Sequence, residues 1–273
     1  MSGLLVHYSA RDIEARILAA IQTAGLNPDQ RISPEELGAL DHFHTGGLRA
    51  TRELVEVANI GPEDAVLDIG AGLAGSARLL ASSIGCRVDC IEMSSDYCVG
   101  ARLLNRITGL EDQIRVHEGS ALELPFQDDS FDVVWMQNVG MNIADKQTLY
   151  KEIARVLKPR GRFVFQEMAA GTVATSYFPL PWATEPADNF LVSADDMKSL
   201  LGQCGFVAEL FEDTSETHLS RSIANATPAA QGQLGLSVFV DNLSQKATNA
   251  RRSLEEGQVR LVRGVFRLEK PSV

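Results

Sequence analysis

A glycine-rich stretch in the first half of the chain limits what this sequence can fold into. It reads VLDIGAGLAG over residues 66–75, between an apolar run at 65–69 and a helical pattern at 74–83. Gly70, Gly72 and Gly75 fit the G-x-G-x-x-G pattern, which becomes informative when a strand precedes it and a helix follows. Such glycines let a ligand approach bare main chain at a helix N-terminus, which favours an anionic group. The stretch therefore predicts a ligand-binding turn, and the alternative is a turn needed only for packing.

The pattern around this turn predicts an α/β fold. Further helical patterns cover 95–108, 146–157 and 194–204, and a Pro159-Arg160-Gly161 turn precedes the run at 162–166. Short apolar runs that read as strands lie at 65–69, 87–91, 113–117, 131–136, 162–166, 206–211 and 258–268. Strands that alternate with helices of this length are typical of a parallel, doubly wound sheet. We therefore expect seven strands with helical additions at the front and before the last strand.

Three parts are expected along the 273 residues. Residues 1–47 read as an N-terminal helical cap or lid, with a helix at 10–24 and a second one starting at Ser33-Pro34-Glu35-Glu36. In that motif Ser is the N-cap, Pro the first helical residue and Glu the partner of a capping box. Residues 48–215 with 258–273 form the predicted core. The segment 216–257 reads as a helical insertion, which either covers a substrate pocket or forms a dimer contact.

Charge and cysteine usage restrict the partners. The chain has 36 Asp and Glu against 25 Lys and Arg, a net charge of −11, which argues against binding a phosphate backbone. Its N-terminal stretch lacks the pattern of a signal peptide, and no apolar run approaches the roughly 20 residues of a membrane helix. The four cysteines form no C-x-x-C pair, so buried reduced thiols are favoured over metal ligands. We expect a cytoplasmic protein, a monomer or homodimer, that binds no metal, nucleic acid or membrane.

Two carboxylates narrow the choice of ligand. Glu92 follows Gly70 by 22 residues, at the end of the next strand, where it can accept both hydroxyls of a ribose. Asp68 precedes the first glycine by two residues, where a carboxylate would repel the pyrophosphate of NAD. The ammonium group of S-adenosylmethionine would suit that carboxylate. The local residues therefore favour S-adenosylmethionine over NAD as the cofactor.

Four segments, in this order and spacing, resemble the class I S-adenosylmethionine-dependent methyltransferases. They are VLDIGAGLAGSARLLA, CIEMSSDY, HEGSALELPFQDDSFDVVWMQNVGMNI and YKEIARVLKPRGRFVFQE. Together they are similar to the small-molecule branch, which includes ubiquinone/menaquinone C-methyltransferases and sarcosine/dimethylglycine N-methyltransferases. The resemblance covers roughly residues 41–213 and implies a Rossmann-like sheet, mostly parallel with an antiparallel last strand.

Carried over residue by residue, the resemblance implies a cofactor site. Asp68, Gly70, Ala71 and Gly72 would face the methionine end, and Glu92 the ribose. The remaining positions would contact the adenine or the sulfonium side, and they are Met93, Ser120, Ala121, Gln137 and Asn138. The relatives' usual Asp for the adenine amino group is replaced by the uncharged Ser120.

The candidate catalytic residues lie in two places. His42 and His44 belong to the segment 41–47, which ends in Gly46-Gly47 and is interpreted as a mobile flap that brings a base; the alternative is two ordinary loop histidines. Glu167 ends the fifth predicted strand and could be a base, an anchor for a cationic substrate or a solvated carboxylate. The predicted function is methyl transfer to O, N or C of a small molecule. The alternatives are a natural-product cyclase or isomerase on the same fold, and an NAD-dependent oxidoreductase.

Overall fold

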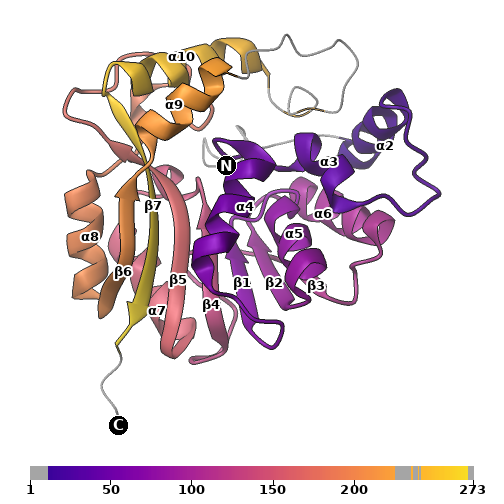
Figure 1. Ribbon diagram of the computed structural model, residues 1–273, viewed down its shortest axis with the longest axis horizontal. Helices are drawn as coiled ribbons and strands as arrows, with labels where there is room; N and C mark the ends of the chain where they lie inside the picture. The colour runs from indigo at the N-terminus through magenta and orange to yellow at the C-terminus, as the bar shows by residue number, and fades with distance from the viewer. Residues whose placement is uncertain (1–11, 225–234, 236–238, 240, 270–273) are drawn as a thin grey trace. The chain divides into compact units, whose positions relative to one another are not determined.

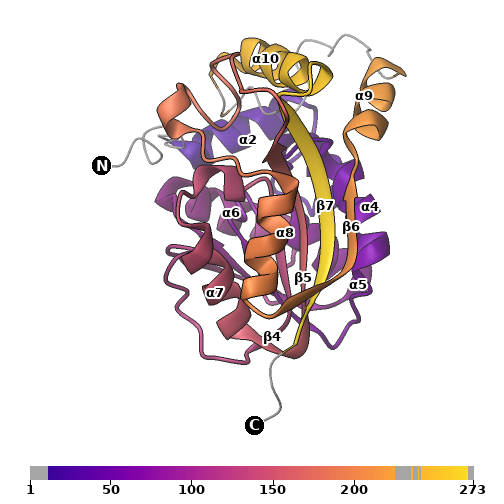
Figure 2. The ribbon, with the colours of Figure 1, turned by 90° about the vertical axis from the view of Figure 1, so that its left-hand side faces the viewer.

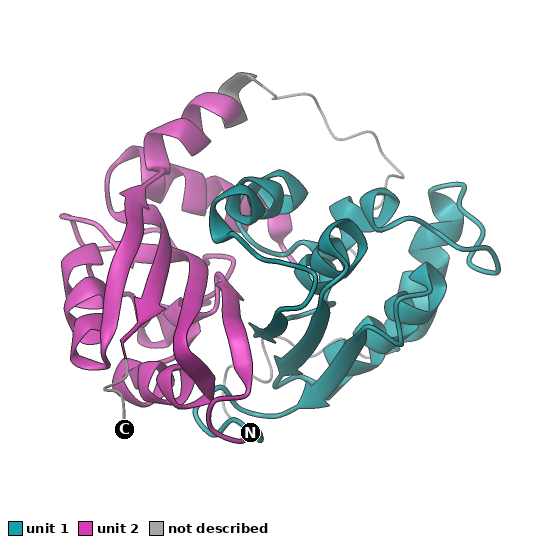
Figure 3. Ribbon diagram, turned by 60° about the horizontal axis from the view of Figure 1, so that its bottom comes forward, with its two compact units in different colours: residues 1–125, 228–240 teal, residues 126–227, 241–273 magenta. Residues whose placement is uncertain are grey.

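The computed structural model describes residues 12–224, 235, 239 and 241–269 (Figure 1). The chain divides into two compact units, one of residues 1–125 with 228–240 and the other of residues 126–227 with 241–273 (Figure 3). Parts of the predicted N-terminal helix and of the predicted insertion at 216–257 lie outside the described residues. The predicted division into cap, core and insertion stays a prediction.

The first unit is built on three parallel strands, β1 (Ala65–Ile69), β2 (Arg87–Glu92) and β3 (Ile114–Glu118). The helices α5 (Gly75–Ile84) and α6 (Ser95–Thr108) connect them. The three predicted strands and the two helices that connect them are present, with ends within one residue of the expected ones. The interior of β1 is buried from Val66 to Ile69, as the continuous apolar run of a strand covered on both faces requires.

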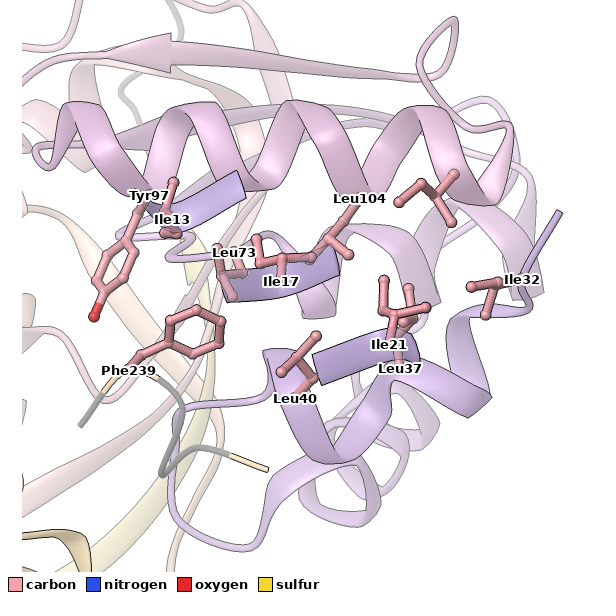
Figure 4. Close-up of a cluster of buried hydrophobic side chains, with 11 residues drawn as sticks. Ile13, Ile17, Ile21, Ile32, Leu37, Leu40, Leu73, Tyr97, Leu104 and Phe239 are labelled. Carbon is pink, nitrogen blue, oxygen red and sulfur yellow. The ribbon is translucent and has the colours of Figure 1, made fainter. Parts of the chain in front are cut away.

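Three more helices precede this sheet, α2 (Ile13–Thr23), α3 (Pro34–Asp41) and α4 (Gly47–Ala58). The predicted capping box is present, because Ser33 accepts the amide of Glu36 while the Glu36 carboxylate accepts the amide of Ser33. The buried face of α2 carries an isoleucine every fourth residue, which is the period of one helix face. Figure 4 shows this face within one apolar cluster with α3 and α6, formed by Ile13, Ile17, Ile21, Ile32, Leu37, Leu40, Leu73, Tyr97, Leu104, Ile107 and Phe239.

The second unit holds β4 (Phe131–Gln137), β5 (Leu157–Ala170), β6 (Phe206–Asp213) and β7 (Val259–Leu268). β4 and β5 are parallel, whereas β7 lies between β5 and β6 and is antiparallel to both (Figure 2). Its helices are α7 (Lys146–Val156), α8 (Ala194–Gln203), α9 (Ser215–Ala224) and α10 (Leu243–Glu255), with short 3₁₀ turns η1 (Gly140–Asn142) and η2 (Pro186–Asp188).

The strand order is β3-β2-β1-β4-β5-β7-β6, so the predicted seven-stranded sheet with an antiparallel last strand is confirmed. Both ends of β5 differ from the predicted 162–166, because the strand begins at Leu157, before the Pro159-Arg160-Gly161 turn, and ends at Ala170. Phe131 pairs with Leu157 while Val133 pairs with Arg162, so the turn residues form a bulge within the strand. In the described part of the chain, the helices are too short or too polar to cross a lipid bilayer.

Candidate functional site

The glycine turn leaves β1 with a backbone that favours glycine. Gly70 and Gly72 have φ values of 66° and 56°, in the left-handed region that side chains disfavour. The amides of Gly70 and Ala71 both donate to the carbonyl of Ile91, at 2.8 and 3.2 Å, which fixes the turn against the end of β2. The turn then leads directly into α5. The ligand-binding turn predicted from the sequence therefore has the expected strand–turn–helix geometry.

Glu92 ties the same turn to the end of β2. Its Oε2 accepts the amide of Gly72 at 2.9 Å, and its Oε1 accepts the amide of Ser94 at 2.8 Å. Burial raises the pKa of this carboxyl although these amides act in the opposite direction. The carboxylate therefore lies beside the turn, as expected, and its role as a ribose acceptor stays a prediction.

Asp68 is the buried acid of this site. The residue is 3% exposed, and its Oδ2 has no hydrogen-bond partner among the residues that the structure describes. Burial, with a further contribution from the Glu92 charge, raises the pKa of Asp68 to about 8. A buried polar atom without a partner is unfavourable, so a ligand that brings a donor would stabilise it. The position fits an ammonium group.

The loop after β3 meets the end of β2 at the same edge. The amide of Gly119 donates to the carbonyl of Glu92 at 3.0 Å, which brings Ser120 and Ala121 to the segment that carries Met93. Met93 is 37% exposed, so its side chain is available to a ligand. Ser120 Oγ accepts the amide of Leu122 at 3.1 Å. The adenine contacts assigned to these residues stay predictions.

Gln137 is the last residue of β4 in the second unit, and Asn138 follows it. The Gln137 side chain accepts the indole N–H of Trp135 at 3.0 Å, and Asn138 accepts the side-chain amide of Gln166 at 3.2 Å. Asn138 has a φ of 54°. Both side chains have hydrogen-bond partners within the protein, so the main-chain carbonyl of Gln137 is the group that we expect to contact a ligand.

The two candidate histidines differ in their partners, because His44 contacts Thr51 whereas both ring nitrogens of His42 are buried without a hydrogen bond among the described residues. His42 is 4% exposed, and His44 Nε2 lies 2.9 Å from Thr51 Oγ1. Burial lowers the pKa of both histidines to about 3, and the nearby Arg78 charge adds to the effect at His42. Both rings are consequently neutral at physiological pH.

A buried arginine that the sequence reasoning missed anchors the segment before these histidines. Arg78 of α5 is fully buried, and its guanidinium donates to Asp41 Oδ2 at 2.7 Å and to Asn105 Oδ1 at 2.8 Å. It also donates to the carbonyl of Leu73, next to the glycine turn. A lone arginine within an apolar helical pattern was the available signal, since charged residues are almost never fully buried unless paired.

Glu167 is 1% exposed and takes its partners from the loop after β4. Its Oε1 accepts the amide of Val139 at 2.8 Å, and both of its oxygens lie 3.1 Å from the amide of Gly140. Burial raises the pKa of Glu167 to about 7 against the effect of these amides. The carboxylate thus orders a loop, and a base or anchor role stays a prediction.

Sequence comparison places these features in a known family. A methyltransferase-domain family model matches residues 67–165. A dimethylglycine N-methyltransferase of Parasynechococcus marenigrum is 31% identical over 83% of this chain and 82% of its own length. A glycine/sarcosine/dimethylglycine N-methyltransferase of Actinopolyspora halophila is 38% identical over 48% of this chain and 23% of its own length. The chain spans less than half the length of the first three relatives that it matches.

Solved structures share the fold. A geranyl diphosphate C-methyltransferase from Streptomyces coelicolor, in complex with S-adenosyl-L-homocysteine, has a TM-score of 0.67 at 17% identity, covering 96% of this chain and 94% of that one. The [4+2]-cyclase SpnF has a TM-score of 0.64 at 19% identity and covers 94% of both chains. At these identities the likeness concerns the fold alone.

Proposed function

Because the chain belongs to the class I S-adenosylmethionine-dependent methyltransferases of small-molecule type, we propose that it transfers a methyl group to a small-molecule acceptor. The observation that carries this proposal is the buried Asp68 carboxyl with an unpartnered oxygen, beside a glycine turn that Glu92 fixes. That combination suits a ligand with an ammonium group and a ribose, and it does not suit a pyrophosphate.

The residues of the first unit would hold the cofactor. Asp68 accepts the ammonium, the main chain of Gly70, Ala71 and Gly72 lies along the methionine end, and Glu92 accepts the ribose hydroxyls. Met93, Ser120 and Ala121 contact the adenine, and Gln137 and Asn138 are assigned to the sulfonium side. When bound, S-adenosylmethionine supplies an electrophilic methyl group on a sulfonium.

For catalysis we propose alignment of the acceptor with this methyl group as the main contribution. Positioning of two reactants can supply about 7–11 kcal/mol of the barrier. An amine acceptor in its neutral form needs no strong base, which agrees with the depressed pKa values of His42 and His44. A base role of His44, His42 or Glu167 would be required for a hydroxyl or carbon acceptor.

We propose a small amine as the acceptor class. The support is the dimethylglycine N-methyltransferase that this chain resembles over 83% of its length. The net charge of −11 agrees with a neutral or cationic substrate and disfavours nucleic acid. All four cysteines are free thiols, which suits the reducing cytoplasm that we propose as its location. As an oligomeric state we propose a monomer or homodimer.

Calorimetry and product analysis test the proposal. Wild-type protein is titrated with S-adenosylmethionine, S-adenosylhomocysteine and NAD, in parallel with Asp68→Asn and with the exposed control Asp112→Asn. We expect binding of the first two ligands, weaker binding by Asp68→Asn and no change in the control. Protein with the bound cofactor is then offered glycine, sarcosine, dimethylglycine and a phenol, and the products are analysed by mass spectrometry.

Each outcome has a defined meaning. Methylation of an amine together with release of S-adenosylhomocysteine supports the proposal, whereas methylation of the phenol alone overturns the amine class. Binding of NAD in place of S-adenosylmethionine contradicts the reading of Asp68. The cyclase alternative is favoured if the protein binds the cofactor but forms no S-adenosylhomocysteine with any acceptor in a broad metabolite screen.

A further inference from the structure

Lys146 occupies a position that electrostatics alone disfavours. It is the first residue of α7, where the positive end of the helix dipole repels a cation. Its side chain is also buried, with the residue 6% exposed. Burial lowers the pKa of Lys146 to about 8, while the nearby Glu167 charge acts in the opposite direction. Such a lysine needs compensating acceptors.

Three main-chain carbonyls provide this compensation. The ammonium donates to Gly140 at 2.8 Å and to Phe190 at 2.7 Å, and it also contacts the carbonyl of Ile143. A lysine ammonium has three donors, so each one has an acceptor. Two of these carbonyls belong to residues 139–143, which we call the β4 loop. Phe190 belongs to the segment that follows β5 and η2.

Two further contacts complete the arrangement. The amide of Phe190 donates to the carbonyl of Met141 at 3.0 Å, so Phe190 is joined to the β4 loop directly as well as through Lys146. Glu167 accepts the amides of Val139 and Gly140, in the two peptide units that precede the Gly140 carbonyl that Lys146 contacts. Met141 is buried in an apolar cluster with Met168, Leu180 and Trp182, and Leu191 packs against it.

We infer that Lys146 is a positioning residue for the methyl acceptor, acting through the β4 loop and the segment at Phe190. Both segments follow the carboxyl end of a strand, β4 or β5, which is the edge where ligands of open α/β sheets bind. All three N–H donors of the Lys146 ammonium contact main-chain carbonyls, so Lys146 acts on the methyl acceptor through these two segments. This inference rests on the proposed methyl transfer.

The test compares Lys146→Met with Lys151→Met, which makes the same change at an exposed position of the same helix. We expect Lys146→Met to reduce kcat/KM for the acceptor by about 10- to 100-fold, the loss that a small misplacement of reactants causes. Its affinity for S-adenosylmethionine should match that of the wild type, because the proposed cofactor residues lie mainly in the first unit. The control should match the wild type in both.

Hydrogen exchange measured by mass spectrometry tests the contacts of Lys146 with these two segments in the absence of a substrate. In Lys146→Met, peptides covering 139–143 and 186–191 should exchange faster together, while peptides of α8 stay unchanged. Lys146→Gln, which keeps a shorter neutral donor, should show the same pattern to a smaller extent and provides a second variant if the first one fails to fold.

The outcomes separate this inference from the proposed function. A purely structural role would lower the melting temperature and leave the acceptor KM and kcat of the folded fraction unchanged, and that result overturns the inference. Unchanged exchange in both peptides overturns it as well. If the exchange changes as expected but wild-type protein methylates no acceptor, the proposed function fails while the contacts of Lys146 stand.

Discussion

Arg78 offers the most direct test of the buried network around the glycine turn. Replacing it by Met keeps most of the side-chain volume and removes the bonds to Asp41, Asn105 and Leu73. The Asp41 carboxylate, which is 1% exposed, then stays buried without its cation. Breaking a buried ion pair in this way destabilises a protein by about 3–5 kcal/mol.

Urea unfolding with and without the partner substitution measures this value. We expect Arg78→Met to lower the free energy of unfolding by about 3–5 kcal/mol. The double variant Asp41→Leu/Arg78→Met should lose less free energy of unfolding than the two single variants lose together. In a thermal melt the single change corresponds to a decrease of roughly 6–20 °C for a protein of this size. The exposed Arg87→Met should stay close to the wild type.

Two results would refute the reasoning. If Arg78→Met lowered the free energy of unfolding by less than about 1 kcal/mol, the ion pair would contribute no more than a pair at the surface. Strict additivity of the two substitutions would show that Asp41 and Arg78 do not interact in the folded protein. In either case Arg78 would not anchor the segment that carries His42 and His44.

Three further predictions concern the cofactor turn and its surroundings. Because the pKa of Asp68 is raised to about 8, the free carboxyl is mostly protonated at neutral pH, so affinity for S-adenosylmethionine should increase between about pH 6 and pH 8. Binding at pH 7 should release a proton, seen by calorimetry in buffers of different ionisation enthalpy, and a pH-independent affinity would contradict this. Gly75→Ala would place a Cβ 2.6 Å from the carbonyl of Asp41 and should destabilise the protein by about 1–3 kcal/mol, whereas Gly202→Ala in open space should stabilise it by up to about 1 kcal/mol; urea unfolding compares them. His44, with a pKa lowered to about 3, should stay neutral above pH 5, so His44→Gln should leave the shape of the pH–rate profile unchanged, and loss of a limb near neutrality would identify His44 as a base.

The sequence predicted the elements better than their contacts. The glycine turn, the Ser33–Glu36 capping box and the seven strands of the sheet were accessible because each depends on a local spacing or on a repeated alternation of strand and helix. The strand β5 was predicted too short, because its pairing with β4 continues beyond the bulge at Pro159-Arg160-Gly161. A turn motif in the sequence does not reveal whether a strand resumes its ladder around it.

The surroundings of Asp68 and Glu167 were decided by the tertiary structure. The positions of these two residues near strand ends follow from the sequence. The sequence does not show that Asp68 Oδ2 lacks a hydrogen-bond partner among the described residues, or that Glu167 accepts main-chain amides. Whether a strand-end carboxylate meets solvent or a neighbouring loop depends on the path of that loop. Of the three alternatives for Glu167, the solvated carboxylate is wrong, because the residue is 1% exposed.

The sequence by itself determined a doubly wound sheet, a glycine turn with two acidic residues near it and the family to which the chain belongs. Only the tertiary structure showed the pairing of Arg78 with Asp41, 37 residues away, and of Lys146 with Phe190, 44 residues away. The physical reason is that secondary structure follows from interactions within a few residues, which leave a periodic pattern. Contacts between distant segments are often made to main-chain carbonyls, which every residue carries and which therefore leave no trace in the sequence.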